Sequence, residues 1–341
     1  RIEGRHKSIG VVGSITPWNW PLMIAIWHII PALRMGNTVI NIPSELTPIN
    51  TLLLGELLQE VLPAGVFNVL SGEGELGKAI SEHSGINKIV FTGSTQTGQH
   101  IMKSAAINLK RLTLELGGND AGIVLPNSNL SDLATAIFAT SFVNMGQTCA
   151  ALKRLYVHES QHDQLCQMLA EIARTQVVAE GFNEKSTFGP VQNKAQLDKV
   201  ISLVEDAKND GATIFSGGER QGEVGYFYPP TIVGNTQNGM TIVDQEQFGP
   251  LLPVIPYKEV SEAIKMANDC EVGLGGSIWG DATQASELAP QLECGSVWIN
   301  GHAEVLPHVP FGGCKMSGFG VEFGLEGLLE NSLLQVININ K

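Results

Sequence analysis

Cys149 is the cysteine in this sequence whose surroundings best suit a nucleophile. It follows Gly146, Gln147 and Thr148, just beyond a predicted long helix over residues 130–144. A loop flanked by small residues would let a substrate reach the thiol, and a thiolate is a strong nucleophile. No adjacent charged residue would stabilise a thiolate, and most cysteines are small buried apolar side chains. Both interpretations of Cys149 therefore stay open at this point.

Two glutamates could carry out the other steps of such a reaction. Glu115 ends a predicted strand and precedes Leu116, Gly117 and Gly118. The carboxyl ends of parallel strands are where general bases often lie. Glu246 lies in a predicted loop over residues 246–250, from which it could accept a hydrogen bond from a ribose hydroxyl. A solvated or salt-bridged glutamate is the alternative for each.

Two turns have residue types that suit anionic groups. Asn19 is enclosed by two prolines and two tryptophans, and this rigid turn could aim an amide at an oxyanion, although a helix-capping asparagine is the alternative. Residues 93–98 join a predicted strand to a helix that we expect to follow Gly98, and such a glycine turn can bind phosphate. The spacing lacks the lysine of a P-loop, so an ordinary turn is the alternative. Residues 72–77 fit a dinucleotide motif only in part, which predicts a plain loop.

Strand and helix patterns alternate along the whole chain, which favours an α/β fold. The first third follows the βαβαβ pattern of a nucleotide-binding open sheet. A terminal strand without an obvious partner suggests pairing across a subunit interface. The expected strands cover residues 9–15, 39–41, 66–70, 88–92, 111–115, 155–158, 212–215, 251–257, 276–279, 295–299 and 333–339. The expected helices cover residues 21–34, 47–62, 130–144, 162–176, 194–208 and 260–270, in addition to the one after Gly98.

Composition narrows the classes of partner. The 341 residues suit about two domains. A net charge of −13 argues against nucleic acid or an anionic membrane as the main partner. The most apolar stretch, residues 22–30, is far shorter than the ~20 residues needed to span a bilayer. The first residues lack the apolar run of a secretory signal. Five scattered cysteines without zinc-site spacing favour a reduced, cytoplasmic setting and no metal.

In this order, several segments resemble the NAD(P)-dependent aldehyde dehydrogenase superfamily over essentially the whole chain. The matching segments are residues 15–21, 31–39, 43–45, 91–95, 114–118, 146–149, 246–250 and 310–318. The resemblance implies an α/β, aldehyde-dehydrogenase-like fold with two Rossmann-like open-sheet domains and a small β oligomerisation arm. We expect an NAD-binding domain over 9–117, a catalytic domain over 118–317, and a return to the cofactor domain and oligomerisation strand over 318–341. A homodimer or homotetramer is implied.

The resemblance also implies individual roles. Cys149 matches the nucleophile that forms a thiohemiacetal and then a thioester. Asn19, with the backbone N–H of Cys149, matches the oxyanion hole, and Glu115 matches the base that activates water. The cofactor-binding positions are Ile15, Trp18, Glu45, Gly93, Ser94, Gly98, Leu116, Glu246 and Phe248. The substrate-pocket positions are Trp20, Met23, Trp27 and Thr148, while His302, Glu304 and His308 either line the pocket mouth or are ordinary surface residues.

The resemblance bears on the cofactor as well. Glu45 matches the acid that holds the adenosine ribose, and an acid there repels a 2′-phosphate, so NAD is favoured over NADP. Ile42 stands where members usually have a lysine that donates to this ribose. We therefore expect weakened cofactor binding. Members usually also carry a long N-terminal stretch before the position of Ile9, without which apolar surface on the first domain should be exposed.

The leading hypothesis is an enzyme that oxidises a medium aliphatic or aromatic aldehyde to its acid with NAD. The apolar side chains after Asn19 favour such substrates over those with a second carboxylate. One alternative is an inactive or weakly cofactor-binding structural relative, which Ile42 motivates. The other is a coenzyme A-acylating aldehyde dehydrogenase, against which Glu115 argues because branches that pass the acyl group to coenzyme A often lack that acid.

Overall fold

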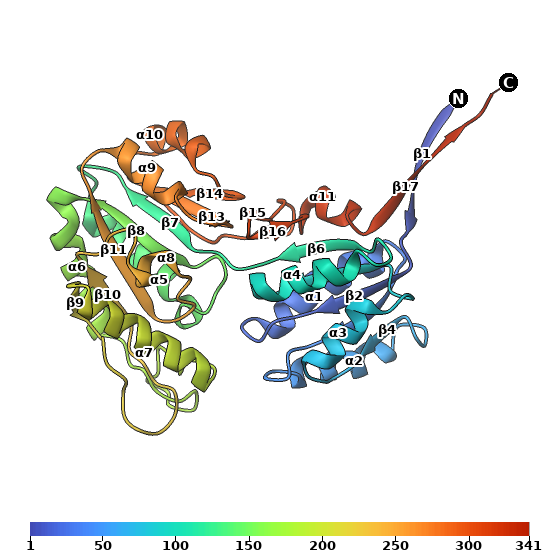
Figure 1. Cartoon of the computed structure of the whole chain (residues 1–341), viewed down its shortest axis with the longest axis horizontal. Coiled ribbons are helices and arrows are strands. Elements are labelled where there is room, and N and C mark those ends of the chain that lie inside the picture. Colours follow the sequence, from blue (N-terminus) through green and yellow to red (C-terminus); the bar gives the residue numbers. More distant parts are fainter. Residues whose placement is uncertain (341) are drawn as a thin grey trace. The chain divides into compact units, whose positions relative to one another are not determined.

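The computed structural model describes residues 1–340, and the chain divides into two compact units (Figure 1). The first, unit 1, contains residues 1–116 and the chain from 305 onward, and the second, unit 2, contains residues 117–304. Each unit is built around a largely parallel sheet with helices on its faces, as the α/β prediction requires.

The sheet of unit 1 has six strands in the order β16-β6-β5-β2-β3-β4. All neighbouring pairs are parallel except β16 with β6. The strands are β2 (Val11–Ile15), β3 (Thr38–Ile42), β4 (Phe67–Val69), β5 (Lys88–Thr92), β6 (Arg111–Glu115) and β16 (Gly318–Phe319), and β15 (Cys314–Lys315) lies just before β16. Every residue of β5 is buried, which is typical of a parallel strand covered on both faces.

The helices of unit 1 cover the two faces of this sheet. Val12, Val39 and Val90 pack with α1 residues on one face, and Ile89, Phe91 and Leu114 pack with residues of α3 and α4 on the other. The helices are α1 (Pro21–Arg34), α2 (Ile49–Gln59), α3 (Gly74–Glu82), α4 (Thr95–Ala105) and α11 (Gly324–Leu329). The chain runs from β2 to β3 and β4 on one side and then returns to β5 on the other, so the strand order reverses between β2 and β5. Ligands of open α/β sheets bind at the carboxyl ends of strands at such a point.

The sheet of unit 2 has seven strands in the order β14-β13-β7-β8-β11-β10-β9, of which β9 is antiparallel to its neighbour. The strands are β7 (Asp120–Val124), β8 (Leu152–His158), β9 (Thr213–Ser216), β10 (Thr231–Gly234), β11 (Leu251–Tyr257), β13 (Gly275–Trp279) and β14 (Ser296–Ile299), with a short β12 (Val272–Gly273) beside them in the chain. The helices are α5 (Leu130–Phe142), α6 (Glu159–Arg174), α7 (Lys194–Asn209), α8 (Thr241–Asp244), α9 (Val260–Asn268) and α10 (Ala282–Leu288), with two 3₁₀ turns, η1 (Val143–Gly146) and η2 (Ala289–Gln291).

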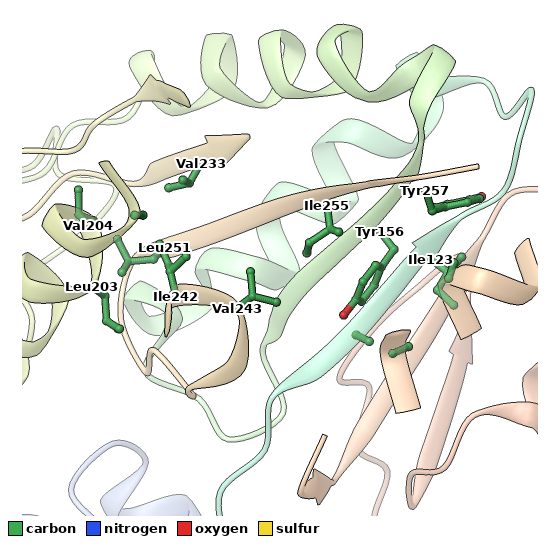
Figure 2. Close-up of a cluster of buried hydrophobic side chains, with 14 of the residues drawn as sticks. Ile123, Tyr156, Leu203, Val204, Val233, Ile242, Val243, Leu251, Ile255 and Tyr257 are labelled. Carbon is green, nitrogen blue, oxygen red and sulfur yellow. The ribbon is translucent and has the colours of Figure 1, made fainter. Parts of the chain in front are cut away.

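Two apolar cores hold unit 2 together, one on each face of its sheet. Figure 2 shows the first, in which strand residues such as Tyr156 and Ile255 pack against α7 and α8. The second packs α5 and α6 against the other face, with Phe142 and Trp279 fully buried. These cores keep the turns at the strand ends in fixed positions, because close-packed interiors deform little.

The terminal strands form an arm of unit 1 that the sequence pattern did not predict correctly. β17 (Ser332–Asn338) pairs antiparallel with β1 (Ile2–Ser8), so that Ile2 lies opposite Asn338 (Figure 1). The expectation that the terminal strand has no partner within the chain was therefore wrong. Apart from Ile2, residues 2–8 have no large apolar side chain and they are mostly exposed, so they lack the apolar alternation that identifies a strand. Association of this arm with another subunit stays a prediction.

The units divide close to the expected position, between residues 116 and 117 rather than after 117. The chain returns to unit 1 at Val305, earlier than the expected residue 318. The backbone N–H of Leu116 donates to Ser317 O at 2.9 Å, and the Thr95 hydroxyl donates to Met316 O at 3.2 Å. These bonds attach the segment before 318 to unit 1.

Two local predictions in unit 1 were wrong. The helix expected after Gly98 already begins at Thr95, because the Ser94 hydroxyl accepts a hydrogen bond from Thr97 N and caps it. The segment expected to be a plain loop contains the start of α3 at Gly74. Helix α2 also presents exposed apolar side chains at Ile49, Leu53 and Leu57. None of the helices in the described chain has the length and hydropathy needed to cross a membrane.

Candidate active site

Unit 1 contains a cavity of about 680 Å³ at the carboxyl ends of β2, β3 and β5. This volume lies within the range of small-molecule and cofactor sites. Five predicted cofactor-binding residues line it, namely Ile15, Trp18, Glu45, Gly93 and Ser94. The cavity therefore lies at the strand-order reversal, where an open α/β sheet is expected to bind its ligand.

The turn between β5 and α4 suits a phosphate group. A side-chain carbon at position 93 would collide with the ring of Phe91, so glycine is required there. Ser94 caps α4, whose first backbone N–H groups carry the partial positive charge of a helix start. These features fit the pyrophosphate of a dinucleotide.

Gly98 and Leu116 lie outside this cavity, although both were predicted to bind the cofactor. A side-chain carbon on Gly98 would overlap the side chain of Leu116, so Gly98 lets α4 pack closely against the sheet. Both residues line a smaller apolar groove with Met102 and Phe319. Their observed role is packing, and cofactor binding by them stays a prediction.

Residues of the segment 72–78 line the same large cavity and were missed in the sequence. Gly72, Glu73, Gly74, Gly77 and Lys78 all contribute to its wall. The two acids in this segment argued for a plain loop, whereas the Gly-x-Gly spacing was the signal that could have identified it. α4 adds two further basic side chains, His100 and Lys103.

Ile42 ends β3 and lines the cavity together with Glu45. It is 4% exposed and packs with Ile80 and Phe91. An aliphatic side chain has no donor, so the side chain of Ile42 offers no hydrogen bond to a ligand hydroxyl in this cavity.

Asn19 and the predicted substrate-pocket residues of unit 1 lie where β2 leads into α1. Asn19 and Trp20 are half-buried, and Pro21 occupies the first position of α1. Trp20, Met23 and Trp27 have the spacing of one helix face. The Trp27 ring contacts the Phe323 ring edge-on, with 4.8 Å between centroids. The result is an apolar aromatic face next to Asn19 in the chain.

Glu115 ends β6 in a setting that suits a general base. The side chain is buried, and within residues 1–340 neither carboxyl oxygen has a hydrogen-bond partner. Burial raises the pKa of Glu115 well above its ordinary value, and the negative charge of Glu322 raises this pKa further. Glu322 in turn lies 3.2 Å from His28 Nε2. A carboxylate with a raised pKa is a stronger base than a solvated one.

Cys149 lies in unit 2, in the turn between η1 and β8, and is half-buried. Three consecutive residues before it have left-handed backbones, Asn144 (φ 49°), Met145 (φ 59°) and Gly146 (φ 69°). A side chain at 146 would collide with the backbone carbonyl of Gly249, so this turn needs its glycine. Non-glycine residues in this conformation store strain, which clusters at functional sites. The turn keeps Cys149, and the half-buried Thr148 before it, out of the packed core.

Glu246 and Phe248 lie in the turn that precedes β11 in unit 2. The carboxylate of Glu246 accepts hydrogen bonds from Lys153 Nζ at 2.9 Å and from Gly118 N at 3.2 Å. The backbone carbonyl of Glu246 accepts from Lys199 Nζ at 2.6 Å. Phe248 has a left-handed backbone (φ 51°), and Lys153 Nζ lies 5.7 Å from its ring centroid. Sequence analysis missed Lys153, because nothing local in the sequence shows which oxygens a lysine will reach.

The predicted mouth residues separate into two groups. His302 is buried in unit 2, with Nε2 3.4 Å from Asp120 Oδ2 and its ring 5.1 Å from that of Trp298. A surface position for His302 was therefore wrong. Glu304 and His308 are exposed. Across the described residues, no cluster of three histidine, cysteine or acidic side chains could hold a metal ion.

The two sheets and the residues at their edges define an α/β protein with a cofactor-sized cavity at the strand ends of one unit and a half-buried cysteine at a turn of the other. The aldehyde dehydrogenase family matches residues 2–337, and the chain belongs to this family. It is 40% identical over 323 residues to the putative aldehyde dehydrogenase DhaS of Bacillus subtilis (strain 168), covering 94% of this chain and 65% of that protein. It is 39% identical to retinaldehyde dehydrogenase 3 of Homo sapiens, covering 98% and 66%.

The fold is also that of solved aldehyde dehydrogenases. The NAD+ complex of aldehyde dehydrogenase from Bacillus cereus superposes with a TM-score of 0.97 at 36% identity, covering 99% of this chain and 70% of that one. The aldehyde-dehydrogenase-like fold and the resemblance inferred from the motifs are thereby confirmed. The chain spans about two thirds of the length of the curated relatives.

Proposed function

We propose that this chain oxidises an aldehyde to its carboxylic acid with reduction of NAD. The observation that carries the proposal is the half-buried Cys149 on a turn strained by two left-handed non-glycine residues, Asn144 and Met145, in a chain of the aldehyde dehydrogenase family. Such strain has a use when it holds a nucleophile out of the core.

The proposed chemistry uses one sulfur, one amide and one carboxylate. The Cys149 thiolate adds to the aldehyde carbon and gives a thiohemiacetal, whose oxyanion is stabilised by the Asn19 amide and the Cys149 N–H. The residues assigned below would hold a dinucleotide, which would supply the acceptor for the hydride that leaves this carbon. Glu115 then takes a proton from a water molecule, which attacks the resulting thioester and releases the acid. The raised pKa of Glu115 supports this role.

The cavity of unit 1 fits the adenosine and pyrophosphate of the cofactor. We assign Gly93 and Ser94 to the pyrophosphate and Glu45 to the adenosine ribose, in a cavity that is large enough for them. An acid at position 45 repels a 2′-phosphate, so NAD is favoured over NADP. Ile15 and Trp18 form further parts of the wall. Glu246 and Phe248 are assigned to the nicotinamide ribose and ring.

The proposed substrate is a medium aliphatic or aromatic aldehyde. Met23 and Trp27 share one face of α1, Trp20 immediately precedes this helix, and Thr148 adjoins the nucleophile. A bulky apolar surface favours an uncharged side chain on the substrate because burying a charge without a partner is costly. We further propose a cytoplasmic homodimer or homotetramer, for which light scattering after gel filtration gives the subunit number.

An aldehyde panel with NAD, followed by the absorbance of the reduced nicotinamide, tests the activity. Cys149→Ala should abolish turnover, whereas Cys270→Ala, a change at another half-buried cysteine, should retain it. Product analysis should give free acid. Turnover unaffected by Cys149→Ala would refute the proposal.

Two outcomes would favour the alternatives instead. Acyl-coenzyme A formed in preference to acid would indicate an acylating dehydrogenase. Absence of turnover with every aldehyde, together with no binding of NAD, would indicate a structural relative.

A further inference from the structure

Lys153 occupies an unusual position for a lysine. It is the second residue of β8, and its side chain is 3% exposed. The ammonium group donates to the backbone carbonyl of Gly118 at 3.0 Å, to the backbone carbonyl of Cys149 and to Glu246 Oε1 at 2.9 Å. An ammonium group has three N–H donors, and these three acceptors use all of them.

The acceptors come from three separate turns of unit 2. Gly118 leads into β7, Cys149 lies in the turn after η1, and Glu246 lies in the turn before β11. Lys153 also lies near the ring of Phe248, at a distance suited to a cation–π contact. One buried cation thus contacts Cys149, Glu246 and Phe248, the three residues of unit 2 that the proposed function uses most directly.

The geometry leaves part of Glu246 available. Lys153 and Gly118 both bind Oε1, so these bonds do not occupy Oε2, and the side chain is 27% exposed. Glu246 also approaches the chain closely at Gly117, where an added side-chain carbon would displace Oε2 from its observed position. One carboxylate oxygen is fixed by the protein while the other can accept a hydrogen bond from a ligand.

We propose that Lys153 is a positioning residue for the oxidation reaction, which it serves by fixing the carboxylate of Glu246 and the carbonyl of Cys149 relative to each other. This inference rests on the proposed function and deepens it. Without the ammonium group, Glu246 loses a charged hydrogen bond and rotates more freely, so it holds the nicotinamide ribose less well. The carbonyl of Cys149 loses a donor at the same time.

The first test is Lys153→Met, which keeps the apolar stem and removes the charge. The dissociation constant of NAD, measured by calorimetry, should rise about tenfold because one charged hydrogen bond no longer orients its binding group. The KM for NAD should rise more than the KM for the aldehyde. Lys88→Met is the matched control. Lys88 is also buried, and its ammonium group donates a hydrogen bond to the backbone carbonyl of Glu330. It begins β5, so it lies at the end of this strand opposite to the cavity. Lys88→Met should lower stability without changing NAD affinity.

A double-mutant cycle with Glu246→Gln separates positioning from a structural role. If Lys153 acts through Glu246, the loss of NAD affinity caused by Lys153→Met should largely disappear in the Glu246→Gln background. The double variant should also melt at a higher temperature than Lys153→Met, because removing both charges is less costly than leaving one buried charge without its partner. This second readout applies even if Lys153→Met folds poorly.

The outcomes distinguish this inference from the proposed function. Equal effects of Lys153→Met in both backgrounds, or equal NAD affinities of Lys153→Met and the wild type, would overturn the role of Lys153 while leaving aldehyde oxidation intact. A wild type that binds NAD but oxidises no aldehyde would refute the proposed function, and the NAD affinities of the four cycle members would still test Lys153.

Discussion

Replacing Ile42 with lysine is the most direct test of how this cavity binds a dinucleotide. Ile42 ends β3, lines the cavity and lies three residues before Glu45. Its side chain is buried among Ile80 and Phe91. A lysine can pack its stem along these apolar residues and extend its ammonium group into the cavity, since lysine stems commonly lie on apolar surface.

Two free-energy terms of opposite sign follow from this position. A hydrogen bond from a charged donor to a ribose hydroxyl is worth about 1.5–3 kcal/mol, or about 10–150-fold in affinity. Full burial of an isoleucine side chain contributes about 1.5–3 kcal/mol to folding, of which the lysine stem keeps a part. The first term acts on binding and the second on stability. A titration of NAD therefore measures the first term, and the free energy of unfolding of the variant measures the second.

Calorimetric titration of NAD into Ile42→Lys and the wild type measures the first term. We expect the dissociation constant to fall at least about tenfold. Ile42→Met is the matched control, because a methionine side chain is nearly as long as that of lysine but has no hydrogen-bond donor. This variant should bind NAD with unchanged affinity. A folded Ile42→Lys variant with wild-type affinity would refute the reasoning, as would an equal gain in Ile42→Met.

Three further predictions concern stability, each measured as the free energy of unfolding by calorimetry or denaturant. The raised pKa of Glu115 means that, above about 4.5, the folded state binds more protons than the unfolded chain, so stability falls as pH rises towards the folded-state pKa. Glu115→Gln should therefore stabilise the protein by about 1–3 kcal/mol at about pH 8 and by much less at about pH 4. Equal changes in the free energy of unfolding at the two pH values would contradict the raised pKa of Glu115. Asn37→Ala should lower the free energy of unfolding by about 2–4 kcal/mol, because the buried side-chain amide accepts hydrogen bonds from Ile9 N and Gly10 N and donates to two backbone carbonyls. Its control, Asn68→Ala, removes one exposed hydrogen bond and should lower the stability far less. Phe142→Ala should cost about 3–5 kcal/mol in the core of unit 2, and Phe182→Ala, at a side chain that is 96% exposed, should be nearly neutral.

Many elements could be predicted from the sequence because their signals are local. The helix over 21–34 and the strands over 88–92, 111–115 and 251–257 have the predicted bounds. Pro21 marks the helix start, and continuous apolar runs mark strands that are buried on both faces. The ordered motifs also indicated the family, which the comparisons confirm. Five of the nine predicted cofactor residues line one cavity, because they end or follow strands whose carboxyl ends meet at the same edge of the sheet.

Other features depend on pairs of residues that are far apart in the chain, and these only the tertiary structure decided. The polar strand β1 is a strand because β17 lies beside it. Glu115 has a raised pKa because folding buries it near Glu322. Lys153 binds oxygens of residues 4, 35 and 93 positions away, and no local pattern records such contacts. Sequence periodicity reports which face of an element is apolar, whereas the partner of a buried charge is set by how the elements pack.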